Sequence, residues 1–268
     1  DIWVNDGDFT PVSTAKKHLN TPLAQQEVRA VFKDTQPEET NVGVQVKQVS
    51  YTWSDAPDTD YIILEYHIRN VTEAPFEKLY TGLFADWDIG EYYKNAAGWD
   101  GESNLGYVYH VANALPYAGI KLLTHDAPIY YAIDNAIDSG GYTFNIEDNF
   151  TTEEKYTTLS GGVARTKAGG KEGANVSHVV GAETVNLAPG ETKIIAFALL
   201  AADNLQNLKK HAAAAQQRYY SFRTSPAAVA LADTACAGST ITWAPEGGST
   251  QFNFYADAEK ETLLSTGT

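Results

Sequence analysis

The side chains most able to do chemistry are concentrated in two short acidic and aromatic-rich segments. Asp86 and Asp88 lie two residues apart on an expected strand, so their carboxylates should project to the same side of it. Asp100 and Glu102 follow, and four carboxylates would supply the oxygen ligands that calcium prefers. Their spacing differs from that of an EF-hand loop. The sequence therefore offers these four residues as a candidate calcium site.

Two other interpretations of these carboxylates stay open. Asp is common in loops, where its carboxylate accepts hydrogen bonds from backbone amides, so Asp86 and Asp88 could simply cap strand ends. Two carboxyl groups about 5–10 Å apart could instead hydrolyse glycosidic bonds in a cleft lined by aromatic rings. The aromatic residues that would suit such a cleft are Trp87, Tyr92, Tyr93, Trp99 and Tyr107. This combination is common in acidic, tyrosine-rich β proteins and is weakly specific.

The sequence lacks the motifs of the better-known catalytic classes. It has no Gly-x-Ser-x-Gly nucleophile elbow, and its six His form no His-x-x-x-His or His-Glu-x-x-His pair. The double glycines at 161–162 and 169–170 lack the Gly-Lys-Ser/Thr ending of a phosphate-binding loop. The single Cys excludes an internal disulfide framework and a cysteine-based zinc site. We therefore expect no catalytic residue, and no cofactor beyond the candidate calcium ion.

Charge and hydropathy narrow the class of protein further. The 268 residues include 19 Lys plus Arg and 34 Asp plus Glu, which gives a net charge of −15. Phosphate backbones and anionic lipid repel such a chain, so we expect no nucleic-acid binding and no membrane insertion. The longest apolar run, residues 194–202, is about half of a membrane span. The chain contains no Met and begins with Asp1, so we expect a piece of a longer, processed protein.

The hydrophobic pattern predicts mostly β-structure. Within residues 61–69, the apolar side chains at 62, 64, 66 and 68 share one face, which we expect to be the buried one. Glycine- and proline-containing turns separate many such short segments, which is typical of an antiparallel β-sandwich. Further strands are expected at residues 42–53, 78–88, 105–112, 119–123, 129–133, 176–187 and 193–201.

One segment has the period of a helix. Apolar side chains recur at steps of three and four from Leu205 to Phe222, and Lys, His, Gln and Arg occupy the other positions. Asp203 is the expected N-cap, and Pro226 marks the end. The fold class that follows is mainly β, with one amphipathic C-terminal helix.

The chain is expected to have two parts. Residues 1–225 would form a β-sandwich accessory domain, and residues 226–268 a linker and a partial β domain. The roughly 33 residues from Cys236 onward are fewer than the roughly 40 that normally fold unaided. This segment therefore either docks on the main domain or opens a second domain that continues beyond the chain.

Several motifs, in this order along the chain, resemble a module found in large secreted proteins of the Bacteroidetes group. The resemblance spans residues 40–222, and it implies a non-catalytic module that commonly follows a subtilisin-like (S8) serine peptidase domain in proteins of the type IX secretion route. It attaches no catalytic residues to the module. The matching segments are residues 61–70, 79–90, 104–109, 117–123, 130–134, 187–191 and 204–219.

The C-terminal segment resembles the opening half of an immunoglobulin-like (Ig-like) repeat common in the same proteins. The matching segments are residues 235–242, 254–255 and 261–268, with Phe254 where the repeat usually has Trp. In that repeat a second Cys lies near the end, so the resemblance implies that the partner of Cys236 falls beyond residue 268.

These observations predict a non-catalytic accessory or structural module of a large secreted protein, located outside the cell or on its surface. Its expected partners are other domains of the parent protein and a polysaccharide or protein substrate. The alternative is a carbohydrate-binding module that uses surface Tyr and Trp, with calcium at Asp86 and Asp88. Three or more aligned aromatic rings exposed on one sheet face would favour this alternative.

Overall fold

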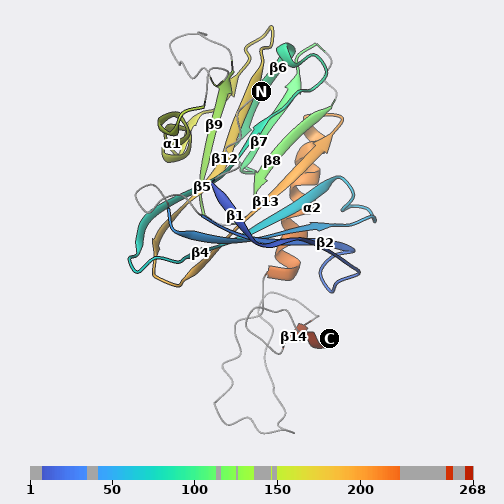
Figure 1. Cartoon of the computed structure of the whole chain (residues 1–268). Coiled ribbons are helices and arrows are strands. Elements are labelled where there is room, and N and C mark those ends of the chain that lie inside the picture. The colour runs from blue at the N-terminus through green and yellow to red at the C-terminus, as the bar shows by residue number, and fades with distance from the viewer. Residues whose placement is uncertain are drawn as a thin grey trace, which may run out of the picture. The chain divides into compact units, whose positions relative to one another are not determined.

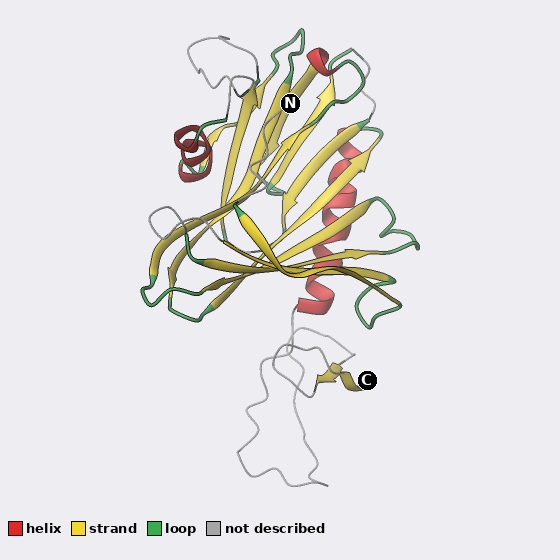
Figure 2. Cartoon of the chain, in the orientation of Figure 1, coloured by secondary structure: helices red, strands yellow, loops and turns green. Residues whose placement is uncertain are grey.

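The computed structural model describes residues 8–34, 42–112, 116–124, 126–135, 146, 150–223, 252–255 and 263–267. The chain divides into two compact units, residues 1–219 and 220–268. The first unit holds two β-sheets and two helices, one helix beside each sheet (Figure 1; Figure 2). None of the helices in the described ranges combines the length and the hydropathy needed to span a membrane.

The larger layer is a nine-stranded antiparallel sheet with the order β1-β2-β3-β4-β13-β8-β7-β6-β11. The first four strands are consecutive along the chain. β13 then inserts between β4 and β8 and joins the two halves of the sheet. The bounds are β1 Phe9–Leu19, β2 Gln26–Asp34, β3 Val44–Thr52, β4 Tyr61–Asn70, β6 Asn95–Asp100, β7 Leu105–His110, β8 Tyr117–Leu122, β11 Lys167–Ala168 and β13 Thr192–Ala202.

The second layer is a four-stranded sheet with the order β10-β9-β12-β5. Its central strand β12 (Val176–Leu187) pairs antiparallel with both β5 (Phe76–Asp86) and β9 (Ala127–Asp134). The short edge strand β10 (Val163–Arg165) pairs with β9 in parallel. Two facing sheets and a C-terminal helix confirm the predicted β-sandwich.

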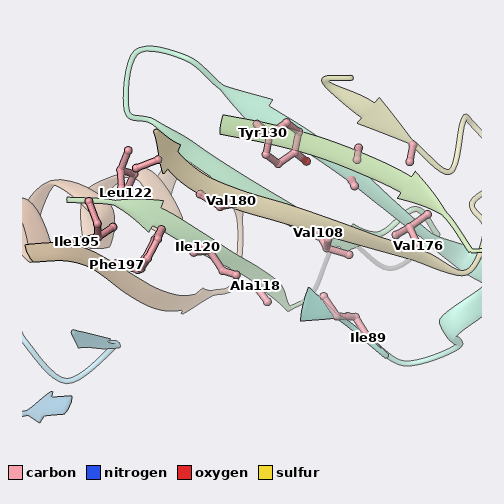
Figure 3. Close-up of a cluster of buried hydrophobic side chains, with 14 of the residues drawn as sticks. Ile89, Val108, Ala118, Ile120, Leu122, Tyr130, Val176, Val180, Ile195 and Phe197 are labelled. Atoms are coloured by element: carbon pink, nitrogen blue, oxygen red, sulfur yellow. The ribbon is translucent and has the colours of Figure 1, made fainter. Parts of the chain in front are cut away.

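The core lies between the two sheets (Figure 3). Phe197 of β13 and Leu122 of β8 are paired neighbours on the nine-stranded sheet, and both are almost completely buried. Tyr130 of β9 and Val180 of β12 face them from the other sheet. Such buried side chains each contribute a few kcal/mol to stability, because truncating one to Ala typically costs about 2–5 kcal/mol.

Strand β4 is covered on both faces, which differs from the sequence prediction. The predicted exposed face contains Ile63 and Glu65, and both are completely buried. On the predicted buried face Ile62 is 40% exposed, although Ile68 is buried in the core. The reason is the helix, which covers the second face of the sheet, so strict alternation of buried and exposed residues does not hold there.

That helix, α2 (Leu205–Arg223), packs on the face of the nine-stranded sheet turned away from the second sheet (Figure 1). We call this face the outer face. Gly119 of β8 marks the contact, because a Cβ there would lie 3.3 Å from Leu208 Cδ2. The N-cap is Asn204, not Asp203, since Asn204 Oδ1 accepts a hydrogen bond of 2.8 Å from the Asn207 amide. An N-cap side chain accepts from the amide of the second or third helical residue, and Asn204, which directly precedes Leu205, bonds the third.

A second helix, α1 (Thr152–Ser160), was not predicted from the sequence. It contacts β9, β12 and β5 of the smaller sheet. Thr151 and Glu154 form a capping box, in which each side chain bonds the other residue's amide. A 3-10 turn (Tyr92–Lys94) precedes β6.

In the second unit the structure describes two strands, β14 (Phe252–Tyr255) and β15 (Leu263–Gly267), which pair antiparallel. Both match segments that the sequence likens to an Ig-like repeat. Cys236 lies outside the described residues, so its predicted pairing stays a prediction.

Candidate functional site: an aromatic surface on the outer face

The four acidic residues predicted to bind calcium lie at the ends of β5 and β6 and in the segments that follow these strands. Strand β5 ends at Asp86, so Asp88 lies beyond the strand and does not share its geometry. Asp86 and Asp88 are exposed, as is Glu102, whereas Asp100 is partly buried at the end of β6. Among the described residues no group of three or more His, Cys, Asp or Glu is placed to hold a metal ion. Calcium binding stays a prediction, which the effect of a chelator on the melting temperature would test.

Asp86 takes part in a polar network at the ends of β5, β9 and β12. Asn135 donates from Nδ2 to Asp86 Oδ1 at 2.8 Å and to Asn175 Oδ1 at 3.0 Å. Ser177 donates its hydroxyl proton to Asn135 Oδ1. These contacts tie three strands together and give Asp86 a structural role. The described residues show no second carboxylate sharing these contacts, as a paired-carboxylate hydrolase would need.

Two of the five aromatic residues near these carboxylates, Trp87 and Trp99, pack against the core, whereas Tyr92 and Tyr93 are exposed. Trp87 donates from Nε1 to His178 Nε2 at 2.9 Å, and His178 is completely buried. Burial alone lowers the pKa of His178 to about 3, because the cationic form would lose its hydration. Trp99 stacks on Tyr130 with ring centroids 4.8 Å apart. These rings stabilise the sandwich and offer no ligand surface.

Three tyrosines are arranged differently. Tyr107 and Tyr109 alternate with core residues on β7, and Tyr117 is paired with Tyr109 across to β8, so all three lie on the outer face. Ring centroids are 5.0 Å apart for Tyr109–Tyr117, 6.2 Å for Tyr107–Tyr109 and 6.3 Å for Tyr107–Tyr117. The three ring planes lie within 34° of one another. All three residues are partly exposed, and we call them the tyrosine platform.

A glycine seats the platform on the sheet. Gly98 of β6 is paired with Tyr107, and a Cβ at Gly98 would lie 2.5 Å from Tyr107 Cζ. The ring therefore lies across the backbone of β6, with one face towards the sheet and the other turned away from it. Ala96, paired with Tyr109, is the other small residue beside the platform. Small residues on β6 thus leave room for the tyrosine rings on β7.

Charged groups border the platform. Lys209 of α2 forms an ion pair of 2.8 Å with Asp100 Oδ1. Burial opposes ionisation of Asp100, but hydrogen bonds from Lys209 and Ser103 and the charge of Lys209 outweigh it and lower the pKa of Asp100. Burial raises the pKa of Tyr107, and the neighbouring Tyr109 adds to that shift. The tyrosine therefore stays protonated and able to donate a hydrogen bond from its hydroxyl group.

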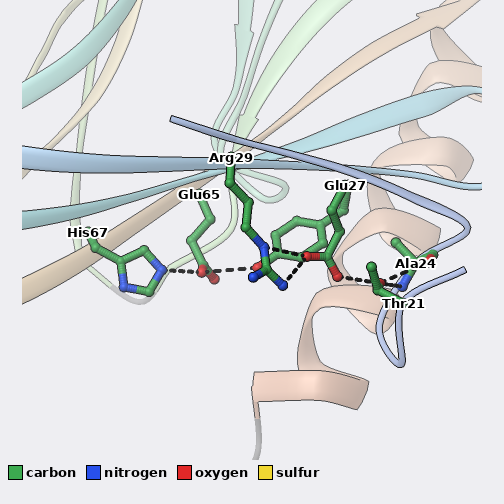
Figure 4. Close-up of polar contacts among 7 residues, drawn as sticks. Thr21, Ala24, Glu27, Arg29, Glu65 and His67 are labelled. Atoms are coloured by element: carbon green, nitrogen blue, oxygen red, sulfur yellow. Dashed lines mark hydrogen bonds and ion pairs between the residues drawn. The ribbon is translucent and has the colours of Figure 1, made fainter. Parts of the chain in front are cut away.

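A second polar group lies on the same outer face, on β2, β3 and β4 (Figure 4). Glu65 is completely buried and is held by His67 Nε2 at 2.6 Å and by the Tyr51 hydroxyl at 3.3 Å. Glu27 is also buried and accepts two hydrogen bonds from Arg29, from Nε at 3.0 Å and from Nη2 at 2.8 Å. Each buried carboxylate is thus matched by a basic side chain, as burial of a charge requires.

A polar pocket of about 490 Å³ opens near the end of α2. Arg218 lies over the Trp53 ring, with its guanidinium carbon 4.7 Å from the centroid, and pairs with Asp58 at 3.5 Å. The indole Nε1 of Trp53 donates to the carbonyl of Leu23 at 3.1 Å. The contacts of Arg218 with Trp53 and Asp58 hold the β3–β4 connection to the helix.

Comparison with known proteins assigns this chain to no family. Neither the protein-family models nor the curated proteins gave a match. Among solved structures, a bacterial glucoamylase complexed with acarbose is similar at 9% sequence identity and a TM-score of 0.46. The alignment covers 76% of this chain and 26% of the glucoamylase chain, so this chain spans about a quarter of that protein's length. A likeness this distant carries no functional argument.

Sequence reasoning named Tyr107 as one of several cleft aromatics but missed Tyr109 and Tyr117 as its companions. The alternation within β7 was readable and predicts that Tyr107 and Tyr109 share a face. The pairing of Tyr109 with Tyr117 depends on the β7–β8 register, and the intervening loop does not specify that register.

Proposed function

We propose that this chain is a non-catalytic carbohydrate-binding module of a larger secreted protein, and that the tyrosine platform is its binding surface. The single observation that carries the proposal is the alignment of three partly exposed rings on one sheet face. The accessory role in a secreted, peptidase-containing parent protein rests on the resemblance of residues 40–222 to such modules. The binding role adds a reason for the parent protein to carry the module.

The chemistry of an exposed aromatic surface fits a sugar ring. The faces of pyranose rings carry C–H groups with partial positive charge, and these pack on the negative faces of aromatic rings. The platform also offers hydroxyl groups that donate hydrogen bonds, and the Asp100–Lys209 pair provides a charged acceptor and a charged donor at its border. Apolar stacking with a few fixed polar groups is the usual composition of a small-ligand site.

Two substitutions test the platform directly. Tyr109→Ala removes the ring that contacts both others, and Gly98→Ala places a methyl group where the tip of Tyr107 lies. Each stacked aromatic ring contributes about 1 kcal/mol or more, so we expect roughly a fivefold or greater loss of affinity in either variant. Affinity electrophoresis against a panel of soluble polysaccharides, followed by calorimetry on those that retard the protein, measures the loss.

The matched control is Tyr92→Ala. Tyr92 is an exposed tyrosine that lies shortly before β6 and is not part of the platform. This variant should bind like the unmodified protein, and circular dichroism should show that all three variants fold. Equal loss in the control and the platform variants, or no polysaccharide bound at millimolar concentration, would refute the proposed function.

A further inference from the structure

The outer face of the sheet is basic in a chain whose net charge is −15. The strand register places five cations of β1–β4 on this face. Lys16 pairs with Arg29, and Lys47 pairs with His67. Because side chains alternate along a strand, Lys33 shares the face of Arg29 on β2, and Arg69 shares the face of His67 on β4. Helix α2 lies on the same face and contains no Asp or Glu. We define the basic face as Lys16, Arg29, Lys33, Lys47 and Arg69 of the strands with Lys209 and Lys210 of the helix.

The carboxylates of this face lie beneath the cations. Side-chain exposure is 34% for Arg29 against 2% for its partner Glu27, and 39% for Lys209 against 15% for Asp100. In the pair of His67 with Glu65, the basic side chain is again more exposed than the carboxylate. At the border of the face, the carboxylate of Asp60 is more exposed than its partner His211. A ligand approaching the strands therefore meets positive charge before it meets negative charge.

Three further exposed cations extend this pattern. Lys16, Lys33 and Arg69 are all exposed. The residue paired with Lys33 across to β3 is Gln45, and Gln45 is paired in turn with Arg69 of β4. An amide thus lies between two cations where a carboxylate would have neutralised them. This arrangement leaves a positive local field on a protein that repels anions elsewhere.

We infer that the glycan bound on the tyrosine platform is acidic, and that the basic face binds its carboxylate or sulfate groups. This inference rests on the proposed function, to which it adds the class of ligand. The platform itself stacks neutral and acidic sugars alike, whereas the cations favour acidic ones. On the outer face helix α2 lies between the two surfaces, since Gly119 of β8 and Ala201 of β13 both contact it. A polymer that reaches both surfaces therefore crosses α2, where Lys209 and Lys210 lie.

A polysaccharide fits these surfaces better than a single-stranded nucleic acid, which is also an anionic polymer. Bases stack well when aromatic side chains stand apart and receive one base each. Here the rings are 5.0–6.3 Å apart and Tyr109 stacks on Tyr117, so no base can insert between these two rings.

The test compares two triple variants of the full chain that have the same net charge. The basic-face variant carries Lys16→Gln, Lys33→Gln and Arg69→Gln. The control carries Lys17→Gln, Lys155→Gln and Lys171→Gln, three exposed lysines outside the basic face. Calorimetry measures binding of polygalacturonate, chondroitin sulfate, neutral dextran and a single-stranded oligonucleotide at two salt concentrations.

We expect the unmodified protein to bind polygalacturonate or chondroitin sulfate more tightly than dextran, and more weakly at high salt. The basic-face variant should lose roughly tenfold or more in affinity for the acidic polymer, and the control variant should lose little. Polygalacturonate carries carboxylates alone, whereas chondroitin sulfate carries both carboxylates and sulfates, so tight binding of polygalacturonate would show that carboxylates are sufficient for recognition.

Several outcomes would overturn the inference. Equal binding of neutral and acidic polymers, with no effect of the basic-face variant, would refute acidic specificity while leaving the tyrosine platform intact. Tighter binding of the oligonucleotide would replace the polysaccharide with a nucleic acid. Absence of binding to every polymer would remove the proposed function together with this inference.

Discussion

Replacing Lys121 by Met should raise the free energy of unfolding at neutral pH. Lys121 lies on β8 and is only 6% exposed, and its Nζ donates a hydrogen bond to the carbonyl of Ser103. Burial lowers the pKa of Lys121 to about 8, although the charge of Asp100 acts in the opposite direction. At pH 7 the folded protein therefore holds a buried ammonium group that would be better hydrated in the unfolded chain.

The magnitude follows from the two pKa values. The folded state loses the Lys121 proton near pH 8 and the unfolded chain near pH 10.5. Between these values the unfolded chain binds more protons, so stability rises with pH through this window. Below pH 8, burial of the charged Lys121 lowers the free energy of unfolding by about 3 kcal/mol. Met keeps the apolar stem but loses the hydrogen bond to Ser103, which is worth about 1 kcal/mol, so the expected gain is about 2 kcal/mol.

Urea unfolding followed by fluorescence at pH 7, 8.5 and 10 measures this effect. The advantage of Lys121→Met should be largest at pH 7 and should shrink as the pH rises towards 10. Lys17→Met, at an exposed position, should change stability by less than about 0.5 kcal/mol at every pH. A Lys121→Met variant that is less stable at pH 7, or a difference independent of pH, would show that the ammonium is not penalised by burial.

Two further predictions concern buried polar contacts and helix capping. Trp87→Phe should lower stability by about 1–3 kcal/mol, because it leaves His178 Nε2 buried without its donor, and the loss should be the same at pH 6 and pH 8 since folded His178 is neutral at both. A loss that changes with pH would contradict this reason. Thr151→Ala should cost about 1 kcal/mol and increase amide exchange in α1, whereas Thr152→Ala, which leaves the capping box intact, should cost less. Equal effects of the two would rule out the capping contribution.

The sequence was sufficient for the elements with a strong period. The strand 176–187 was predicted with its observed bounds, and the stripe from Leu205 to Phe222 lies within α2. Helix α1 was missed because its residues form no apolar stripe, yet the Thr151–Glu154 capping box was visible in the sequence. β1 was missed because its residues are mostly polar and exposed, as suits an edge strand.

The candidate site was less predictable, because it depends on contacts between segments far apart in the sequence. Nothing near Tyr107 indicates that Gly98 lies beneath its ring or that Lys209, about 100 residues later, pairs with the neighbouring Asp100. The carboxylates Asp86 and Asp88 are close in sequence, which predicts a shared site. Strand β5 ends at Asp86, so Asp88 does not continue the strand and need not point to the same side. The aromatic surface arises elsewhere, from the register of β7 with β8.

The position of β13 between β4 and β8 also governs the order in which the chain can fold. As the chain is synthesised, β1–β4 can form successive hairpins early, but the partner of Tyr61 on the open side of β4 is Leu200, almost 140 residues later. Until β13 emerges, the ladder groups of β4 are an unpaired edge that can recruit strands from other chains. Pairing over such a separation is slow. Truncations that remove β13 should therefore yield aggregates rather than a smaller soluble sandwich.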